Sequence, residues 1–181
     1  MIARRAQELD PLSLIINSYL GYVLYLNREY VPAMDQLKRT IAMDQDFAIA
    51  HYFLSRVMVQ NNLADEAVTH AERAAHLSPN NPGMTAALAY AYAAAGEKQR
   101  ALHTLRTLRN SPTVAAVVPD VALAYARLND QGAAFKALEI ARTSGTLWSI
   151  SLGTEPALDI IRNDKRFAEL LKKVGLPYPA P

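Results

Sequence analysis

The chain has 181 residues, of which 51% are hydrophobic, with seven glycines, no cysteine and a formal net charge of +2. This hydrophobic content excludes a disordered chain, and the absence of cysteine excludes disulfide scaffolds, cysteine-bound metals and thiol nucleophiles. The small net charge does not indicate nucleic acid or an anionic membrane as a partner. The sequence shows no apolar signal-peptide stretch at its start and no run near the ~20 residues of a membrane span, so we expect a cytoplasmic protein.

Abundant alanine and leucine favour helices, because these side chains lose little freedom in a helix. No segment alternates polar and apolar residues with a period of two, so we predict an all-α fold. In chain order, the predicted helices span residues 12–26, 30–43, 47–60, 64–77, 82–95, 98–109, 117–128 and 131–143, followed by short helices near 155–162 and 164–174. Asp10-Pro11 and Asn81-Pro82 each place a capping residue before a proline, which predicts helix N-termini. Turns between paired helices are predicted at Asn61-Asn62, Ala95-Gly96-Glu97 and Asn129-Asp130.

The predicted helices recur with a period of 34 residues. Matching positions 34 residues apart are Leu20, Leu54 and Leu88, and likewise Ala33, Ala67 and Ala101. A fourth copy follows with one residue deleted, and its matching residues are Val121, Ala122, Tyr125, Ala134, Leu138 and Ala141. Alanine near the start of each second helix lets the two helices of a pair approach closely. Each pair exposes an apolar face that the next pair covers, which predicts one elongated core.

The period, the pattern Leu20-Gly21-x-x-Leu24 and the small residue nine positions later resemble the tetratricopeptide repeat (TPR). The resemblance covers residues 12–143 and divides them into repeats at about 12–45, 46–79, 80–112 and 113–145. It implies a right-handed superhelix of four helix pairs. The sequence departs from the family where an early tryptophan is usual, a position occupied here by Asn17, His51, Thr85 and Val118.

The two ends of the chain lie outside the four repeats. Residues 1–11 match the second half of a second helix, so we expect this chain to be the C-terminal piece of a longer protein, with an improvised N-terminal cap as the alternative. Residues 146–181 predict a helical cap and a proline-rich tail. The apolar face of this cap comprises Trp148, Leu158, Ile161, Phe167, Leu170 and Leu171.

The tail carries a second resemblance. Residues 159–167 and 170–177 are similar to the C-terminal ends of bacterial TPR regulators, although two prolines usual there are Ile160 and Lys165 here. Such regulators carry an N-terminal winged-helix, Ser/Thr kinase or adenylyl-cyclase-like domain. None of these domains is visible in the 181 residues.

The sequence offers no constellation typical of catalysis. No two of its four histidines have the helical spacing of metal ligands, and Glu66 with His70 would need a third ligand. Glycine-rich phosphate loops and activated nucleophiles are also missing. We therefore expect no enzyme activity, no cofactor and no metal site. The basic residues Arg100, His103, Arg106 and Arg109 are interpreted as a solvated face, with contact to an acidic partner as the alternative.

The TPR resemblance implies that the first helix of each pair lines a concave groove. The groove positions hold Tyr22, Tyr25, Tyr52, Arg56 and Tyr90. Tyrosine and arginine dominate binding hot spots, so these are the candidate binding residues. The alternative is that they pack against neighbouring helices. Some TPR proteins clamp a terminal carboxylate with Lys, Asn and Arg, but the matching positions here cannot do so, because they are Ser18, Tyr22, Phe53, Gly83 and Ala87.

We therefore predict a non-catalytic protein–protein interaction module that binds a protein or peptide segment on its concave face. The resemblances imply that it is the C-terminal regulatory region of a bacterial signalling or transcription-regulator protein. Two alternatives stay open: a small-molecule sensor that controls an N-terminal output domain, and a module that forms homodimers through its N-terminal face. We expect no direct contact with nucleic acid or membrane.

Overall fold

A computed structural model of the chain describes residues 2–109, 114–143 and 152–177, and these residues form helices and no strand. The predicted all-α fold is therefore confirmed. The helices are α1 (Ile2–Leu9), α2 (Leu14–Leu26), α3 (Tyr30–Met43), α4 (Ala48–Gln60), α5 (Ala64–Leu77), α6 (Pro82–Ala94), α7 (Lys98–Arg109), α8 (Val114–Arg127), α9 (Gln131–Thr143), the 3₁₀ helix η2 (Pro156–Ile161) and α10 (Lys165–Lys173).

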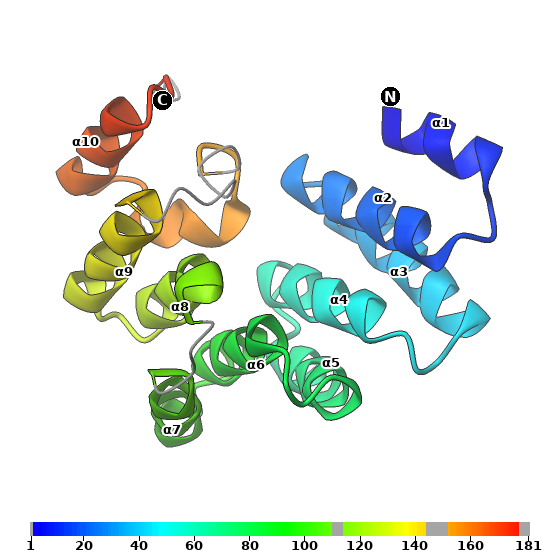
Figure 1. Ribbon diagram of the computed structural model, residues 1–181, viewed down its shortest axis with the longest axis horizontal. Helices are drawn as coiled ribbons and strands as arrows, with labels where there is room; N and C mark the ends of the chain where they lie inside the picture. Colours follow the sequence, from blue (N-terminus) through cyan, green and yellow to red (C-terminus); the bar gives the residue numbers. More distant parts are fainter. Residues whose placement is uncertain (1, 110–113, 144–151, 178–181) are drawn as a thin grey trace.

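The helices form antiparallel pairs that stack into a curved, right-handed solenoid (Figure 1). The pairs are α2 with α3, α4 with α5, α6 with α7 and α8 with α9, and α2, α4, α6 and α8 lie on the inner side of the arc. As the repeat predicted, the alanine near the start of each second helix is fully buried. These residues are Ala33, Ala67, Ala101 and Ala134. Gly21 serves the same close packing, because a Cβ added there would lie 2.5 Å from Cγ of Leu37 on α3.

The helix ends follow local capping chemistry. Asn81 caps α6 as predicted, since its side chain accepts a hydrogen bond of 2.9 Å from the amide of Gly83. The prediction at Asp10 is wrong: Ser13 caps α2, and the Asp10 amide bonds to the carbonyl of Ala6 at 3.0 Å. Asp10 therefore ends the preceding helix. The predicted turns are confirmed by left-handed backbone at three positions, Asn62, Gly96 and Asn129.

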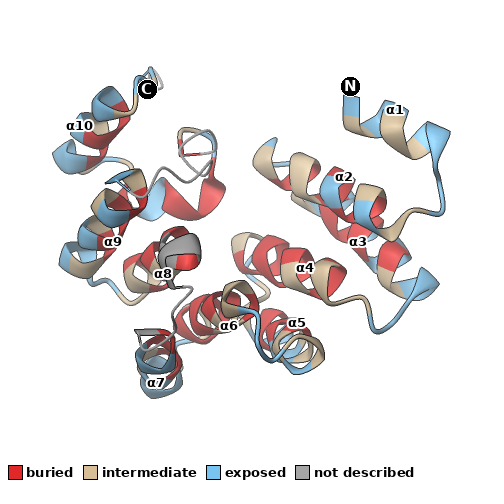
Figure 2. Ribbon diagram, viewed as in Figure 1, coloured by how far each residue is buried: buried red, intermediate tan, exposed pale blue. Residues whose placement is uncertain are grey.

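The C-terminal cap, residues 152–177 comprising η2 and α10, closes the solenoid beyond α9. The predicted apolar residues Leu158, Ile161, Phe167, Leu170 and Leu171 are all buried, whereas Trp148 lies outside the described residues. These side chains join one hydrophobic core that runs from α2 to α10. Figure 2 shows how the buried residues follow the contacts between helices, while α1 and the outer faces are largely exposed.

Candidate peptide-binding site

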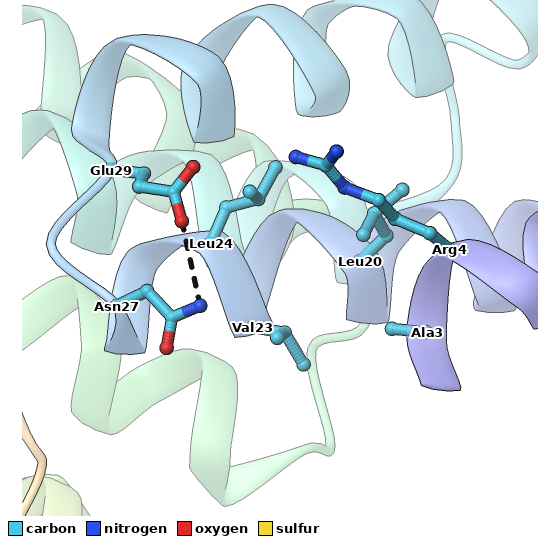
Figure 3. A pocket seen from close by; sticks show the side chains of 7 residues that line it. All are labelled: Ala3, Arg4, Leu20, Val23, Leu24, Asn27 and Glu29. Atoms are coloured by element: carbon cyan, nitrogen blue, oxygen red, sulfur yellow. Dashed lines mark hydrogen bonds between the residues drawn. The ribbon is translucent and has the colours of Figure 1, made fainter. Parts of the chain in front are cut away.

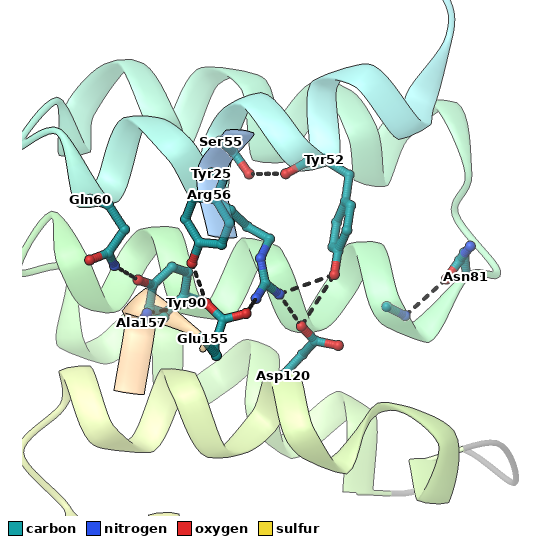
Figure 4. A network of polar contacts seen from close by, with 11 residues as sticks. Tyr25, Tyr52, Ser55, Arg56, Gln60, Asn81, Tyr90, Asp120, Glu155 and Ala157 are labelled. Carbon is teal, nitrogen blue, oxygen red and sulfur yellow. Dashed lines mark hydrogen bonds and ion pairs between the residues drawn. The ribbon is translucent and has the colours of Figure 1, made fainter. Parts of the chain in front are cut away.

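The structure brings four of the five predicted groove residues close to one another on the inner side of the arc. They come from three inner helices: Tyr25 from α2, Tyr52 and Arg56 from α4, and Tyr90 from α6. Two acidic residues from distant parts of the sequence contact Arg56 in this cluster: Asp120 of α8 and Glu155 of the C-terminal cap (Figure 4).

Arg56 lies at the centre of this cluster and is only 4% exposed. Its Nη2 donates to Oε2 of Glu155 at 2.9 Å, and its Nη1 pairs with Oδ1 of Asp120 and lies 3.1 Å from the hydroxyl of Tyr52. Burial opposes the charge, but Tyr52, Glu155 and Asp120 outweigh it and hold the pKa of the Arg56 guanidinium well above its usual range. A charged arginine buried in this way is stable only with such partners.

Glu155 lies between side chains of the inner helices α2 and α4 and is fully buried. Its Oε1 accepts hydrogen bonds from the hydroxyl of Tyr25 and, at 3.1 Å, from the amide of Ala157. Glu155 is thus both the N-cap of η2 and the partner of Arg56. Burial and the nearby Glu155 carboxylate raise the pKa of the Tyr25 hydroxyl well above its ordinary value, so Tyr25 stays protonated and donates.

We call the set Tyr25, Tyr52, Arg56, Asp120 and Glu155 the Arg56 network. Tyr52 donates to Oδ1 of Asp120 at 3.2 Å, and burial raises the pKa of its hydroxyl. Tyr90 lies beside this network and accepts from Nε2 of Gln60 at 2.6 Å. The Arg127 guanidinium carbon is 5.9 Å from the centre of the Tyr90 ring. Both carboxylates of the region, Asp120 and Glu155, therefore pair with one arginine, Arg56.

Tyr22, the fifth predicted residue, belongs to an aromatic cluster next to the Arg56 network. Its ring stacks on Phe53 at a centroid distance of 4.7 Å and on Tyr25 at 5.9 Å. Tyr19 meets the edge of Phe53 at 5.6 Å and is 53% exposed. The cluster thus gives α2 and α4 a partly accessible aromatic surface.

Sequence reasoning missed Asp120, Glu155 and the role of Phe53. Nothing local marks them, because Arg56 is separated from Asp120 by 64 residues and from Glu155 by 99. One signal was present: Glu155 precedes Pro156 at the start of a predicted helix, which is the pattern of an N-cap. A buried N-cap carboxylate would have suggested a cationic neighbour.

A hollow lies between α1 and α2. It has a volume of about 290 Å³ and is lined by Ala3, Arg4, Leu20, Val23, Leu24, Asn27 and Glu29 (Figure 3). Several large apolar side chains of the first two helices and the segment between them are exposed: Ile2, Leu9, Leu12 and Ile15. We call these exposed residues, Ile2, Leu9, Leu12 and Ile15, the N-terminal face.

The described residues contain no group of three His, Asp or Glu side chains that could hold a metal ion. His51 and His70 do meet, with their Nδ1 atoms 2.9 Å apart, but the described part of the chain adds no third ligand to them. None of the described helices combines the length and hydrophobicity that a membrane span requires.

Stacked antiparallel pairs with a concave inner face define this chain as a TPR-type helical solenoid in fold. Solved structures agree: YrrB, a TPR protein with an unusual peptide-binding site, has 16% identity and a TM-score of 0.55, covering 96% of this chain and 91% of YrrB. TTC0263, a thermophilic TPR protein of Thermus thermophilus, has 19% identity and a TM-score of 0.61, covering 89% of this chain and 91% of TTC0263.

A third structure, the APC/C hetero-tetramer Cut9–Hcn1, has 14% identity and a TM-score of 0.63, covering 96% of this chain and 35% of the matched one. No family model matches the sequence, and no characterised protein matches it in sequence. The structural likenesses therefore establish the fold.

Proposed function

We propose that this chain is a non-catalytic module that binds a peptide or protein segment on its concave face. One observation carries the proposal: the inner face already holds a peptide segment, the chain's own residues 155–161. Tyr25 and Arg56, both predicted as groove residues, make the polar contacts with that segment through Glu155. The aromatic cluster around Tyr22 and Phe53 extends the same surface beyond it.

The experiment that tests the proposal is selection from a displayed peptide library on the full chain. Selected peptides are then mapped on the protein by hydrogen exchange. We expect protection on α2, α4 and α6, and at least a tenfold loss of affinity in Tyr22→Ala and Tyr52→Ala, because large aromatic side chains dominate such interfaces.

A matched control uses the outer side of the solenoid. Arg73 of α5 forms an exposed ion pair with Asp46, so Arg73→Ala should bind the selected peptides as the wild type does. Peptides that protect only the outer helices, or that bind the two tyrosine variants at full affinity, would contradict the proposal.

The context of the module is proposed from the likeness of its tail to bacterial TPR regulators. In that context the groove belongs to a cytoplasmic regulatory region next to a DNA-binding, kinase or cyclase-like output domain. The sequence of the complete gene tests this directly. A small-molecule sensor is less well supported, since Arg56 and Tyr25, two of the candidate groove residues, are already paired with the buried Glu155 of the chain itself.

Self-association is a second candidate function, favoured by the N-terminal face. Ile2 is 89% exposed, Leu12 77% and Leu9 72%, and large apolar side chains with this exposure are candidates for burial in an interface. Light scattering over a hundredfold range of concentration should show dimers of the full chain. Ile2→Glu with Leu12→Glu should abolish them, and a strict monomer at the highest concentration would exclude this candidate.

A further inference from the structure

The concave face is occupied in the structure by a carboxylate that belongs to the chain itself. Glu155 has no solvent exposure and draws on Arg56 and Tyr25, two side chains that come from the inner helices. No other described carboxylate is as deeply buried. The contacts therefore show what chemistry this part of the groove accepts: an anionic carboxylate followed by an apolar stretch, here Pro156-Ala157-Leu158.

We propose that the partner of the concave face presents an acidic side chain, glutamate or aspartate, which competes with Glu155 for Arg56 and Tyr25. This inference rests on the proposed function and names the chemistry of the bound segment. The groove is thus a site for an acidic peptide, and the chain carries its own copy of the ligand.

The Arg56 guanidinium has a hydrogen-bond donor, Nε–H, that Glu155 does not use. Glu155 reaches Nη2 alone, and Nε of Arg56 is buried without a hydrogen-bond partner in the part of the chain that the structure describes. The other oxygen of Glu155 is engaged by Tyr25 and by the amide of Ala157. A carboxylate that does not have to cap η2 can instead take Nε and Nη2 together, in the bidentate geometry that arginine favours.

The effective concentration of the tethered Glu155 segment sets the peptide concentration that is needed to displace it. A tethered ligand acts at an effective concentration on the order of millimolar, so a free peptide with the same contacts competes only at similar concentrations. The outer contact of the segment is weak, because Arg28 and Asp159 pair while both are nearly half exposed. Weakening the internal carboxylate should therefore open the site to an acidic peptide.

The probe is a fluorescent peptide that copies residues 153–162, Gly-Thr-Glu-Pro-Ala-Leu-Asp-Ile-Ile-Arg, with a second peptide in which the glutamate is glutamine. Binding is measured by anisotropy to the full wild-type chain, to Glu155→Gln, and to a control, Glu139→Gln. Glu139 is a partly exposed carboxylate paired with Arg142 and Lys173, away from the groove.

We expect Glu155→Gln to bind the glutamate peptide at least tenfold more tightly than the wild type does, and at least tenfold more tightly than it binds the glutamine peptide. Glu139→Gln should match the wild type. A folded Glu155→Gln chain that binds both peptides equally, or neither, overturns the proposal. If Glu155→Gln does not fold, Glu155→Asp replaces it, with the same preference for the glutamate peptide expected and its absence equally decisive.

The outcome is separable from that of the proposed function. Library peptides that protect the concave face but lose nothing when their acidic residues become amides would leave peptide binding standing and reject the acidic ligand. Absence of any protection on α2, α4 and α6 would reject the proposed function itself.

Discussion

Arg56 holds a full positive charge where almost no water reaches it, so its partners decide its effect on stability. Asp120 and Glu155 both pair with Arg56, so removal of the cation leaves a fully buried carboxylate, Glu155, and a partly buried one, Asp120, without their cationic partner. Breaking a buried pair in this way costs several kcal/mol, whereas breaking an exposed one costs little.

We expect Arg56→Met, which keeps the volume and removes the charge, to lower the free energy of unfolding by about 3–5 kcal/mol. Urea denaturation followed by circular dichroism measures the change. Arg73→Met, which removes an exposed pair with Asp46, should lose no more than about 1 kcal/mol. Equal losses in the two variants would show that the Arg56 network does not stabilise the fold.

Gly21 is a residue whose missing side chain matters. A methyl group there would meet Cγ of Leu37 at 2.5 Å, and Leu37 is fully buried and cannot swing away. Overpacking costs about 1–3 kcal/mol, against roughly 1 kcal/mol of helix propensity gained. We therefore expect Gly21→Ala to lower the thermal midpoint. Gly132→Ala, whose methyl group meets only Oδ1 of Asp130 at 3.6 Å, should leave the midpoint unchanged or raise it.

At the scale of single residues, the repeat register predicted which side chains lie on the inner helices. It could do so because a 34-residue period fixes the face of the helix on which each position lies. It could not predict that Tyr25 and Arg56 are covered by Glu155, since that contact depends on where the cap returns in space. The period stops at residue 143 and carries no information about the cap.

Between elements, α4 and α5 are joined by a pair of histidines that responds to pH. His51 donates from Nε2 to the carbonyl of Gln45 at 3.0 Å, so the neutral ring accepts at Nδ1 from Nδ1 of His70. Burial and the proximity of His51 lower the pKa of His70 to about 4.

The sign of the pH effect follows from that shift. The unfolded chain binds a proton at His70 near pH 6.5, whereas the folded chain binds it only at about pH 4. The contribution of His70 to the free energy of unfolding is therefore fully present above pH 6.5 and is lost as the pH falls toward 4. Solvent access to His70 limits the loss to about 1–2 kcal/mol. Urea midpoints at pH 7.5 and 4.5 should differ less in His70→Gln than in the wild type. His76→Gln, a change at an exposed residue, should keep the wild-type difference.

Helix bounds were predictable to within about three residues wherever the period applied, because capping residues and turns repeat with it. The exception at Asp10 has a local cause: Pro11 follows the end of α1, and the chain needs Leu12 and Ser13 before α2 begins. The short helix after Glu155 was predicted as a helix, and its 3₁₀ geometry was not, since six residues give little sequence signal.

Over the whole molecule, the solenoid differs from a simple linear array. In linear arrays each repeat contacts only its neighbours. Here the C-terminal cap reaches the first repeat, through Glu155 to Tyr25 and through Asp159 to Arg28. The sequence predicted the array and its elongated core, and the contact between its two ends is a property of the curvature that only the structure shows.

Because of this contact, a substitution that destabilises the C-terminal cap should also destabilise the first repeat, which lies at the other end of the sequence. The ring of Phe167 in α10 is fully buried and lies under the Arg162 guanidinium, at 5.2 Å. Arg162 in turn donates to the carbonyls of Gly153 and Glu155, at 2.9 and 3.2 Å, and so holds the segment that carries the Glu155 carboxylate. Phe167→Ala should cost about 3–5 kcal/mol and loosen this segment.

Hydrogen exchange separates this path from a general loss of stability. Phe167→Ala should raise exchange not only in η2 and α10 but also at the end of α2, around Tyr25, because that helix loses its partner. Leu105→Ala in α7 removes a buried side chain of an outer helix and costs a comparable amount, about 2–5 kcal/mol. Its effect should stay within α6, α7 and α8. Faster exchange at Tyr25 in both variants, or in neither, would show that the cap does not stabilise the first repeat.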